Sequence, residues 1–361
     1  MLAPTTPPPT TTTRAEAGSV RSADTAESVA GGTIEGQAAR FREITEHPAV
    51  DAQTGDSVPG GRDIDALLDR LPSTSGRPRT VEDLPGGLTN RNLKVTTPAG
   101  CVVVRLSGNA TSLLAIDRDN EYANSVAAAA AGAGAPVVDY LPGEGVLVIG
   151  YLPGRTLHDG DLAETGQLRR VAEACRRLHD GPRFRDDFDM FATQRRYLGI
   201  VQSHGLRLPP RYTESAPAVE RIRAALAVRP EPAVPCNNDL LAENFIDDGD
   251  RTWIIDYEYS GNNDPCFELG NIWSEASLPP DHLDELVTAY YGRSLCNKIA
   301  RARLLGLMSK YGWTLWASIQ DARSELDFDF WSWGMEKYER AVSEFDGPDF
   351  ERLLQEVQRV D

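Results

Sequence analysis

Three polar residues at fixed offsets near the middle of the chain constrain its fold and chemistry more than any other feature. Asp239 is followed five residues later by Asn244, and Asp256 stands directly after the apolar run Trp253-Ile254-Ile255. A single Asp in a loop indicates little, because Asp is a common turn residue. The whole set is harder to explain by turns alone, since an apolar strand leads into its last member. The pattern therefore predicts a loop, a strand and a second loop that carry one site.

This spacing is typical of kinase-like phosphotransferases. In such enzymes an Asp of the catalytic loop takes the proton of the acceptor hydroxyl, and Asp239 is predicted to do so here. Asn244 and Asp256 are then predicted to bind Mg²⁺, a hard cation that prefers oxygen ligands. Glu258 could contact a second metal or its water, and an exposed strand end would explain it equally well. Phosphoryl transfer needs little covalent chemistry from the protein, so positioned carboxylates, a metal and a cation are nearly sufficient.

Composition limits the classes of partner. The formal net charge of −17 argues against nucleic acid or an anionic membrane as a partner, and it is weakly compatible with a cationic substrate. Five scattered cysteines without CxxC spacing favour reduced thiols over a disulfide framework or a zinc site. We find no apolar run of the length of a membrane helix and no signal-peptide pattern, so we expect a cytoplasmic location.

Periodicity and composition divide the chain into three parts. Residues 1–60 are rich in Thr, Pro, Ala, Gly and Ser, and we expect a mostly disordered tail with a short helix around 38–45. Residues 61–150 are expected to form a nucleotide-binding lobe of β-β-β-α-β-β order after a first helix. The elements expected there are a helix over 63–71, strands over 81–88 and 93–97 about a turn at 89–92, a strand over 101–106, a helix over 119–131, and strands over 137–140 and 145–149.

Residues 151–361 are expected to form a helical catalytic and substrate lobe. Leu168, Val171, Ala172, Cys175 and Leu178 lie on one face of a predicted helix that ends at residue 179. Further helices are expected over 218–227, 282–291, 298–319 and 328–345. The predicted fold class is α+β, with a small mixed N-terminal lobe, a larger helical C-terminal lobe and a nucleotide in the cleft between them.

Several segments also carry a family resemblance. The strongest are 236–245, 255–259 and 267–271, supported by 151–157, 177–182 and 188–191. From Asp83 to Tyr338 the chain resembles the choline/ethanolamine kinase family, within the aminoglycoside-phosphotransferase and protein-kinase superfamily. The resemblance implies a bilobal protein kinase-like fold, with ATP and Mg²⁺ as cofactors. The chain departs from the family at Asn237, where His is usual, and at Glu268, where Asp is usual. That His commonly supports the catalytic loop, and Asn can also donate and accept hydrogen bonds.

The resemblance also assigns the nucleotide side of the site. Segment 86–95 resembles the nucleotide-binding hairpin of the family, and its candidate contacts are Leu88, Thr89, Asn90, Arg91 and Asn92. Arg105 stands where protein kinases carry Lys, and its guanidinium offers two parallel donors to phosphate oxygens. The alternative for Arg105 is a strand-end side chain that reaches solvent. Glu121 is a candidate partner of Arg105, and Tyr151 and Leu152 look like the hinge.

Aromatic residues near the C-terminus point to the acceptor. Trp313 and Trp316 share one helix face, and aromatic faces attract quaternary ammonium groups. Aromatics at helical spacing are, however, more often core. In the family that the chain resembles, the segment 311–316 lines the choline pocket, Trp333 falls at a second-helix aromatic, and Glu275 falls at an acidic residue that faces the choline cation. The candidate substrate contacts are Asp239, Glu258, Glu275, Trp313, Trp316 and Trp333.

Three functions remain open at this stage. The first is an ATP-dependent kinase of choline or a related small amino alcohol. The second is a kinase of another hydroxylated substrate, such as an aminoglycoside, a thiamine-like cation or a modified sugar. The third is a non-catalytic binding module on a kinase scaffold, which the intact set Asp239, Asn244 and Asp256 disfavours. The oligomeric state is not predicted.

Overall fold

The computed structural model describes residues 63–361 except residues 86, 88–89, 109–110, 115 and 325. The tail expected over 1–60 and the helix expected around 38–45 lie outside the described residues. Two candidate nucleotide contacts, Leu88 and Thr89, also lie outside them.

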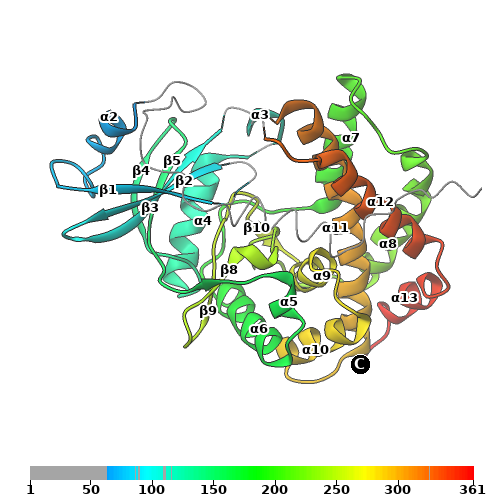
Figure 1. Ribbon diagram of the computed structural model, residues 1–361. Coiled ribbons are helices and arrows are strands. Elements are labelled where there is room, and N and C mark those ends of the chain that lie inside the picture. Colours follow the sequence, from blue (N-terminus) through cyan, green and yellow to red (C-terminus); the bar gives the residue numbers. More distant parts are fainter. Residues whose placement is uncertain (1–62, 86, 88–89, 109–110, 115, 325) are drawn as a thin grey trace, which may run out of the picture. The chain divides into compact units, whose positions relative to one another are not determined.

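The first part of the described chain is a five-stranded antiparallel sheet in the order β1-β2-β3-β5-β4 (Figure 1). Its strands are β1 (Thr80–Leu84), β2 (Asn90–Thr97), β3 (Gly100–Ser107), β4 (Val137–Leu141) and β5 (Val146–Gly150). The helix α4 (Arg118–Ala130) lies between β3 and β4 in the sequence, so the expected β-β-β-α-β-β order is confirmed. A short helix that was not expected, α3 (Thr111–Leu114), precedes α4.

The predicted turn at 89–92 is wrong in its bounds. Asn90 begins β2, and Asn92 pairs with Leu84 on one side and with Arg105 on the other. Among the described residues, Asn90 and Arg91 pair with β3 alone, and this pairing gives their backbone groups partners that a polar turn would have left to solvent. The candidate contacts Asn90, Arg91 and Asn92 are therefore presented from a strand and not from a turn.

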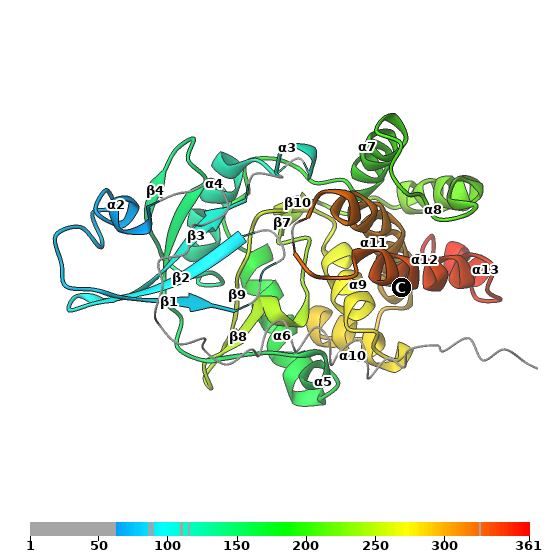
Figure 2. The same cartoon turned by 45° about the horizontal axis from the view of Figure 1, so that its top comes forward.

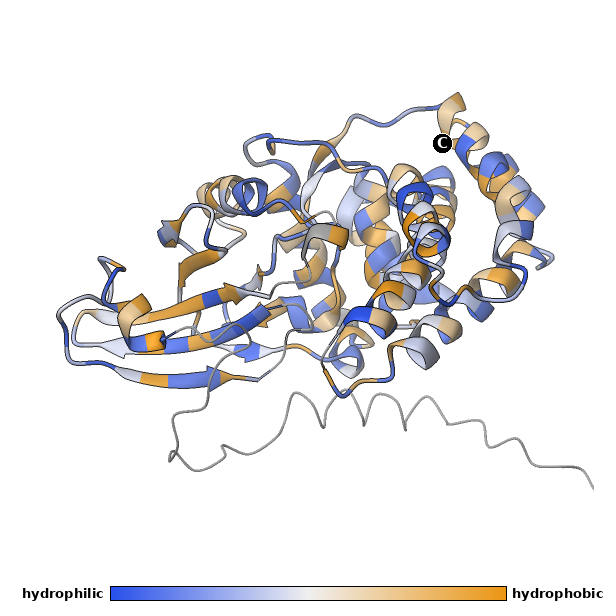
Figure 3. Ribbon diagram, turned by 90° about the horizontal axis from the view of Figure 1, so that it is seen from above, coloured by the Kyte–Doolittle hydropathy of each residue, from blue (hydrophilic) through white to orange (hydrophobic). Residues whose placement is uncertain are grey.

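Strand alternation fixes the direction of Arg105. The apolar side chains of the neighbouring Val104 and Leu106 join α2 (Ile64–Leu68) in a small core on one face of the sheet. Because successive side chains of a strand point to opposite faces, Arg105 points away from that core. Figure 3, coloured by hydropathy, shows apolar and polar residues interleaved along these strands. The buried Arg105 corrects the alternative of a solvent-reaching arginine, since only 6% of the residue is exposed.

The second part of the described chain is mainly helical. Its helices are α5 (Asp159–Leu162), α6 (Thr165–His179), α7 (Met190–Ser203), α8 (Ala216–Val228), α9 (Pro265–Glu275), α10 (Pro280–Tyr291), α11 (Cys296–Arg323), α12 (Phe330–Phe345) and α13 (Phe350–Glu356). The helix α11 is buried along most of its length and packs against α7, α9 and α12 (Figure 2). None of the helices in the described part of the chain combines the length and apolar character that crossing a membrane requires.

Four of these helices were not expected: α5, α7, α9 and α13. The apolar pattern of α9 is masked by Glu268, Asn271 and Ser274, which are polar yet fully or nearly fully buried. Their polar groups face other parts of the chain instead of water, so the amphipathic pattern that sequence reasoning uses is lost. The α+β class expected from the sequence is confirmed by the order of sheet and helices.

Short strands carry the predicted site within the helical part. They are β6 (Arg155–Thr156), β7 (Val234–Cys236), β8 (Phe245–Asp247), β9 (Thr252–Ile254) and β10 (Gly261–Asn263). Strands β6, β8 and β9 form one sheet, and β7 pairs with β10. Asp239 follows β7, the 3₁₀ turn η2 (Ala242–Asn244) precedes β8, and Asp256 follows β9. The loop, strand and loop predicted around Asp239 and Asp256 are therefore present.

Candidate active site

The loop that carries Asp239 is held by α9. Glu268 accepts the backbone N–H groups of Asn237 at 3.0 Å and of Asn238 at 2.8 Å. One helical turn further, Asn271 Oδ1 accepts the N–H of Leu240 at 2.7 Å. Hydrogen bonds to a charged acceptor are stronger than neutral ones, and all these groups are buried. The buried polar side chains of α9 thus fix the backbone on both sides of Asp239.

Asn237 joins the Asp239 loop to Asp256. Its side-chain amide donates to the carbonyls of Ile255 at 3.1 Å and Asp256 at 2.8 Å, and its Oδ1 accepts the N–H of Asp239 at 3.1 Å. The expectation that Asn at this position can still donate and accept is confirmed. Asp256 has a positive φ of 63°, which is unusual for a non-glycine residue. The two bonds from Asn237 flank the backbone at this strained position.

Asn244 lies close to Asp239. Its Nδ2 donates to the carbonyl oxygen of Asp239 at 2.7 Å, and this bond turns the amide so that its oxygen faces away from the carbonyl. Residue 244 ends η2, immediately before β8, and is partly exposed. An amide oxygen held in this way is a ligand that a hard cation accepts.

Arg105 connects the N-terminal sheet to Asp256. Its Nη2 lies 2.6 Å from Asp256 Oδ1 and 3.2 Å from Glu121 Oε1, so the ion pair expected with Glu121 is present. Burial lowers the pKa of the Arg105 guanidinium, but the charges of Asp256, Glu121 and Glu258 outweigh burial and hold its pKa above the usual value. The arginine is therefore charged and held between the sheet, α4 and the end of β9.

A second arginine, Arg118, was not predicted as a site residue. Its Nη1 lies 2.6 Å from Glu121 Oε2 and 3.2 Å from Glu258 Oε2. Asn90 also donates to Glu258, at 2.9 Å. The available signal was spacing, because a basic residue three positions before Glu121 on a helix shares its face. Glu258 is buried and not at an exposed strand end, and burial together with Asp256 and Glu121 raises its pKa to about 7.

A buried triad made of His179 on α6, Cys236 on β7 and Glu268 on α9 supports the same loop. His179 Nε2 lies 3.5 Å from Glu268 Oε1 and 3.6 Å from Cys236 Sγ, and His179 Nδ1 is hydrogen-bonded to Tyr290 Oη at 2.7 Å. These three residue types could also bind a metal. Both oxygens of Glu268 already accept backbone N–H groups of the loop. We therefore interpret the triad as a hydrogen-bonded support of the loop and not as a metal site.

The other predicted nucleotide contacts have varied surroundings. Arg91 forms a two-bond pair with Asp83, at 2.6 and 2.9 Å, on the exposed side of β1 and β2. Tyr151 follows β5, its backbone N–H donates to Cys101, and Lys94 Nζ lies 5.0 Å from its ring centroid. Leu152 is half-buried beside it.

The aromatic residues divide into core and pocket candidates. Trp313 and Trp316 are 4% and 6% exposed, and both belong to the main hydrophobic core. Tyr259 joins them: its ring lies 5.1 Å from that of Trp313, and its hydroxyl accepts the Trp316 N–H at 2.7 Å. Trp316 meets Trp333 edge to face, with centroids 5.7 Å apart. Trp333 is less buried than the other two, so the open side of this aromatic group lies at α12.

Glu275 is the last residue of α9 and is paired with Lys337 of α12. The Lys337 ammonium also lies 4.1 Å from the centroid of the Trp333 ring. Burial, followed by the charges of Glu275, Glu258 and Asp256, raises the pKa of Asp239 well above its usual value. Lys337 was not predicted from the sequence, because its pairing with Glu275 depends on the packing of α12 beside α9.

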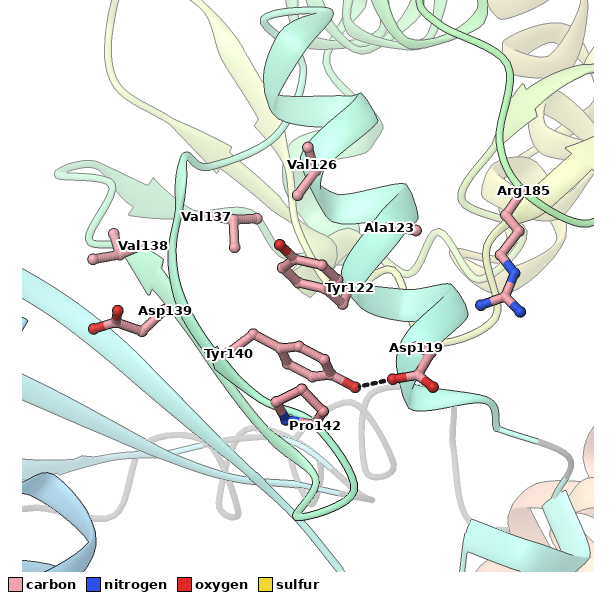
Figure 4. A pocket seen from close by; sticks show the side chains of 10 residues that line it. All are labelled: Asp119, Tyr122, Ala123, Val126, Val137, Val138, Asp139, Tyr140, Pro142 and Arg185. Carbon is pink, nitrogen blue, oxygen red and sulfur yellow. Dashed lines mark hydrogen bonds between the residues drawn. The ribbon is translucent and has the colours of Figure 1, made fainter. Parts of the chain in front are cut away.

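A cavity of about 640 Å³ lies elsewhere, between α4 and β4 (Figure 4). The rings of Tyr122 and Tyr140 stack in it with centroids 4.3 Å apart, and Tyr140 donates to Asp119 at 2.6 Å. Two exposed valines, Val126 and Val138, line its edge. None of the predicted site residues lines this cavity, so it is distinct from the arrangement around Asp239 and Asp256.

Comparisons with known proteins identify the family of this chain. A model of the family described as choline/ethanolamine kinase matches residues 81–286, more than half of the 361 residues. Protein LicA of Haemophilus influenzae is 30% identical over 262 residues, which cover 68% of this chain and 75% of that protein. Ethanolamine kinase 2 of Mus musculus is 28% identical over 279 residues, which cover 68% of this chain and 70% of that kinase.

A solved structure gives the same result for the fold. The crystal structure of a choline/ethanolamine kinase family protein from Mesorhizobium loti matches with a TM-score of 0.73 at 32% identity, over 82% of this chain and 98% of that chain. The chain belongs to the choline/ethanolamine kinase family, a family of nucleotide-using phosphotransferases with an alcohol group as acceptor. The family resemblance and the kinase-like α+β fold expected from the sequence are confirmed.

Proposed function

We propose that this protein transfers the γ-phosphoryl group of ATP, with Mg²⁺, to the hydroxyl of choline or a closely related small amino alcohol. The observation that carries this proposal is the bonding of the Asp239 loop to Asp256 through Asn237. A base and a metal ligand held in one rigid unit supply the positioning on which phosphoryl transfer depends. Residues 61–150 would serve as the nucleotide lobe and residues 151–361 as the catalytic and substrate lobe.

The side chains around Asp256 fit a magnesium-bound nucleotide. Arg105 Nε, Arg118 Nε and Arg118 Nη2 are buried and have no hydrogen-bond partner among the described residues. Such donors suit phosphate oxygens, and unpaired buried donors are otherwise costly. Asn244 Oδ1 and the Asp256 carboxylate would hold Mg²⁺, which neutralises charge that develops on the phosphoryl oxygens when it is bound.

Asp239 is the proposed base. Its pKa is raised by burial and by the charges of Glu275, Glu258 and Asp256, so its carboxylate holds a proton more firmly than a solvent-exposed Asp. A stronger base is a better acceptor for the proton of an alcohol as its oxygen attacks phosphorus. The hydrogen bond from Asn244 to the Asp239 carbonyl fixes the position of the proposed metal ligand relative to the proposed base.

The aromatic group at α11 and α12 supports a cationic acceptor. Trp316, Trp333 and Tyr259 form an aromatic wall, and aromatic faces bind quaternary ammonium groups. Glu275 adds a carboxylate whose charge acts on Asp239. An aminoglycoside, with several dispersed ammonium groups, calls for many carboxylates and few rings. A thiamine-like cation or a modified sugar stays an alternative, and a non-catalytic module is disfavoured by the intact set Asp239, Asn244 and Asp256.

A screen for ADP release tests the proposal. Purified protein would be assayed with ATP and Mg²⁺ against choline, ethanolamine, dimethylethanolamine, thiamine and aminoglycosides, with Asp239→Asn as the inactive control. We expect the highest kcat/KM for choline or dimethylethanolamine. Turnover of thiamine or an aminoglycoside alone would overturn the amino alcohol assignment. ADP release that persists in Asp239→Asn at the wild-type rate would overturn the assignment of the base.

A further inference from the structure

A lysine of α12 is paired with Glu275, the carboxylate that we expect to face the cation of the acceptor. Lys337 forms an ion pair with Glu275 Oε2, and its ammonium lies 4.1 Å from the centroid of the Trp333 ring. Only 10% of the Lys337 side chain and 4% of the Glu275 side chain are exposed. Buried charges are poorly screened by water and salt, so each strongly affects the field of the other. Lys337 therefore offsets much of the negative charge that Glu275 would present.

The second carboxylate oxygen of Glu275 differs from the first in its hydrogen bonding. Oε1 is buried and has no hydrogen-bond partner among the described residues. This one oxygen is the only acceptor that Glu275 has left for the three N–H donors that a primary ammonium carries. The Lys337 ammonium lies against the Trp333 ring, and Trp333 meets Trp316 edge to face, so the pair lies beside the aromatic residues that we propose for the acceptor.

The two simplest amino alcohols make different demands on such a pair. A primary ammonium carries three N–H donors, and each must find an acceptor once its water is removed. A quaternary ammonium carries none, and rings can hold it through its surface charge alone. A carboxylate whose charge and one oxygen are already committed to a lysine serves the primary ammonium poorly. The Lys337 ammonium lies over part of the Trp333 ring, and Trp316 contacts the same ring edge to face.

We propose that Lys337 sets the preference of this pocket for a quaternary over a primary ammonium, by neutralising Glu275 and occupying one of its oxygens. The inference rests on the proposed amino alcohol kinase activity. Lys337 is a specificity-determining residue that acts through Glu275, and it takes no part in phosphoryl transfer itself. Its effect is therefore measured as the ratio between two acceptors, since any effect of its charge on Asp239 is common to both.

The test compares kcat/KM for ethanolamine and choline in wild type and Lys337→Met. Methionine keeps an apolar stem beside Trp333 and removes the charge. We expect the ethanolamine-to-choline ratio to rise about tenfold, the factor of a 1.4 kcal/mol difference, with the KM for ATP within about twofold of wild type. Lys337→Arg should keep the wild-type ratio, because it keeps the positive charge.

A matched control comes from the same protein. Lys310 also pairs with a carboxylate, Glu344 at 2.6 Å, and its ammonium lies 4.6 Å from the centroid of Trp273. Lys310→Met therefore removes the same kind of contact from α11, and the acceptor ratio should not change. The double variant Lys337→Met/Glu275→Gln should also return the ratio to the wild-type value, since the effect acts through Glu275.

The outcomes separate this inference from the function on which it rests. Absence of turnover with both amino alcohols in the wild type would overturn the proposed function itself. Turnover by the wild type, together with an unchanged ratio in folded Lys337→Met, would overturn only the role of Lys337. If Lys337→Met does not fold, Glu275→Gln is the deciding variant. It leaves the Lys337 charge without its partner, so we expect the KM for choline and the KM for ethanolamine to rise at least about tenfold. Unchanged KM values would contradict the inference.

Discussion

Arg105 Nη2 donates a hydrogen bond to Asp256 Oδ1 at 2.6 Å, and through it β3 of the N-terminal sheet is bonded to the end of β9. The same nitrogen lies 3.2 Å from Glu121 Oε1 on α4. The guanidinium thus contacts the carboxylate that we propose as a metal ligand. Binding of magnesium and nucleotide would redistribute these contacts, with Arg105 turning part of its donor capacity to phosphate.

The first prediction concerns Arg105. Lysine keeps the charge but offers a point-like ammonium in place of the planar fork, so it cannot serve Asp256, Glu121 and a phosphate together. We expect Arg105→Lys to raise the KM for ATP at least about tenfold and to change the KM for the acceptor much less. Arg223→Lys, at an exposed pair with Glu220, is the control and should leave both constants unchanged. Equal KM values for ATP in wild type and Arg105→Lys would remove Arg105 from the nucleotide site.

The second prediction separates the base from the metal ligand. Asp239→Asn should lower kcat by about 10²–10⁴, the usual contribution of a general base, while nucleotide binding is retained. Asp256→Asn should instead shift the magnesium titration of activity to higher concentration, because a charged ligand is lost. Calorimetric titration of each variant with ATP and Mg²⁺ measures the difference. The proposed roles are contradicted if the two variants behave alike.

The third prediction concerns Glu268. Glutamine at this position keeps the shape but loses the charge, and its amide NH₂ cannot accept a backbone N–H. We expect Glu268→Gln to lower the free energy of unfolding by about 1.5–3 kcal/mol, the range for hydrogen bonds to charged groups. The midpoint of denaturant unfolding measures the change. Glu220→Gln, at an exposed residue, should stay within about 0.5 kcal/mol of wild type.

The spacing along the sequence was sufficient to expect that Asp239, Asn244 and Asp256 lie near one another, because a loop and a short strand leave little geometric freedom. Asn244 is bonded to Asp239, and Asn237 joins that loop to Asp256, while the roles of the three residues stay predictions. Arg118 and Lys337 were not predicted, since their importance depends on which helices pack together, and spacing along the chain does not contain that information. Glu258 had two readings, and only tertiary packing decided between an exposed and a buried position.

The same limit explains the fold elements that were missed. The order of strands and helix along the N-terminal part of the chain followed from short apolar runs and turns, which are local signals. The helix α9 carries a polar face that is buried against the Asp239 loop, so its pattern does not separate inside from outside. The turn expected at 89–92 was wrong because pairing with β3 extends β2 to Asn90, and strand pairing depends on a segment distant from this turn in the sequence.

The fourth prediction concerns the crossing of α9 and α11. A Cβ built on Gly270 would meet the carbonyl oxygen of Ala302 and would lie 2.7 Å from the backbone nitrogen of Gly306. Backbone atoms cannot move aside as a flexible side chain can, so we expect Gly270→Ala to destabilise the fold by at least about 1–3 kcal/mol. Gly199→Ala, in α7 with open space at its Cβ, should instead be neutral or stabilise the protein by up to about 1 kcal/mol. Thermal unfolding of the two variants checks the contrast.

The last prediction tests whether the aromatic wall binds the acceptor. Removing the whole indole from a residue as buried as Trp316 would leave a cavity costing about 3–5 kcal/mol, so Trp316→Ala would mix stability with binding. Trp316→Phe keeps an aromatic ring and loses the bond to the Tyr259 hydroxyl. We expect the KM for choline to rise several-fold, up to about the tenfold that one cation–π contact of about 1.4 kcal/mol supplies.

The nucleotide supplies the internal reference for this experiment. The KM for ATP should be unchanged in Trp316→Phe, because the proposed phosphate contacts, Arg105 on β3 and Arg118 on α4, are held by Asp256, Glu121 and Glu258. Trp253→Phe, on β9, loses an exposed indole N–H bond to Asp248; it is the control for loss of an indole N–H and should leave the choline KM as it is. A loss of stability in Trp316→Phe with no specific change for choline would assign the tryptophan to the core. The phosphotransferase assignment would survive that result, since it depends on Asp239, Asn244 and Asp256 and not on the aromatic residues.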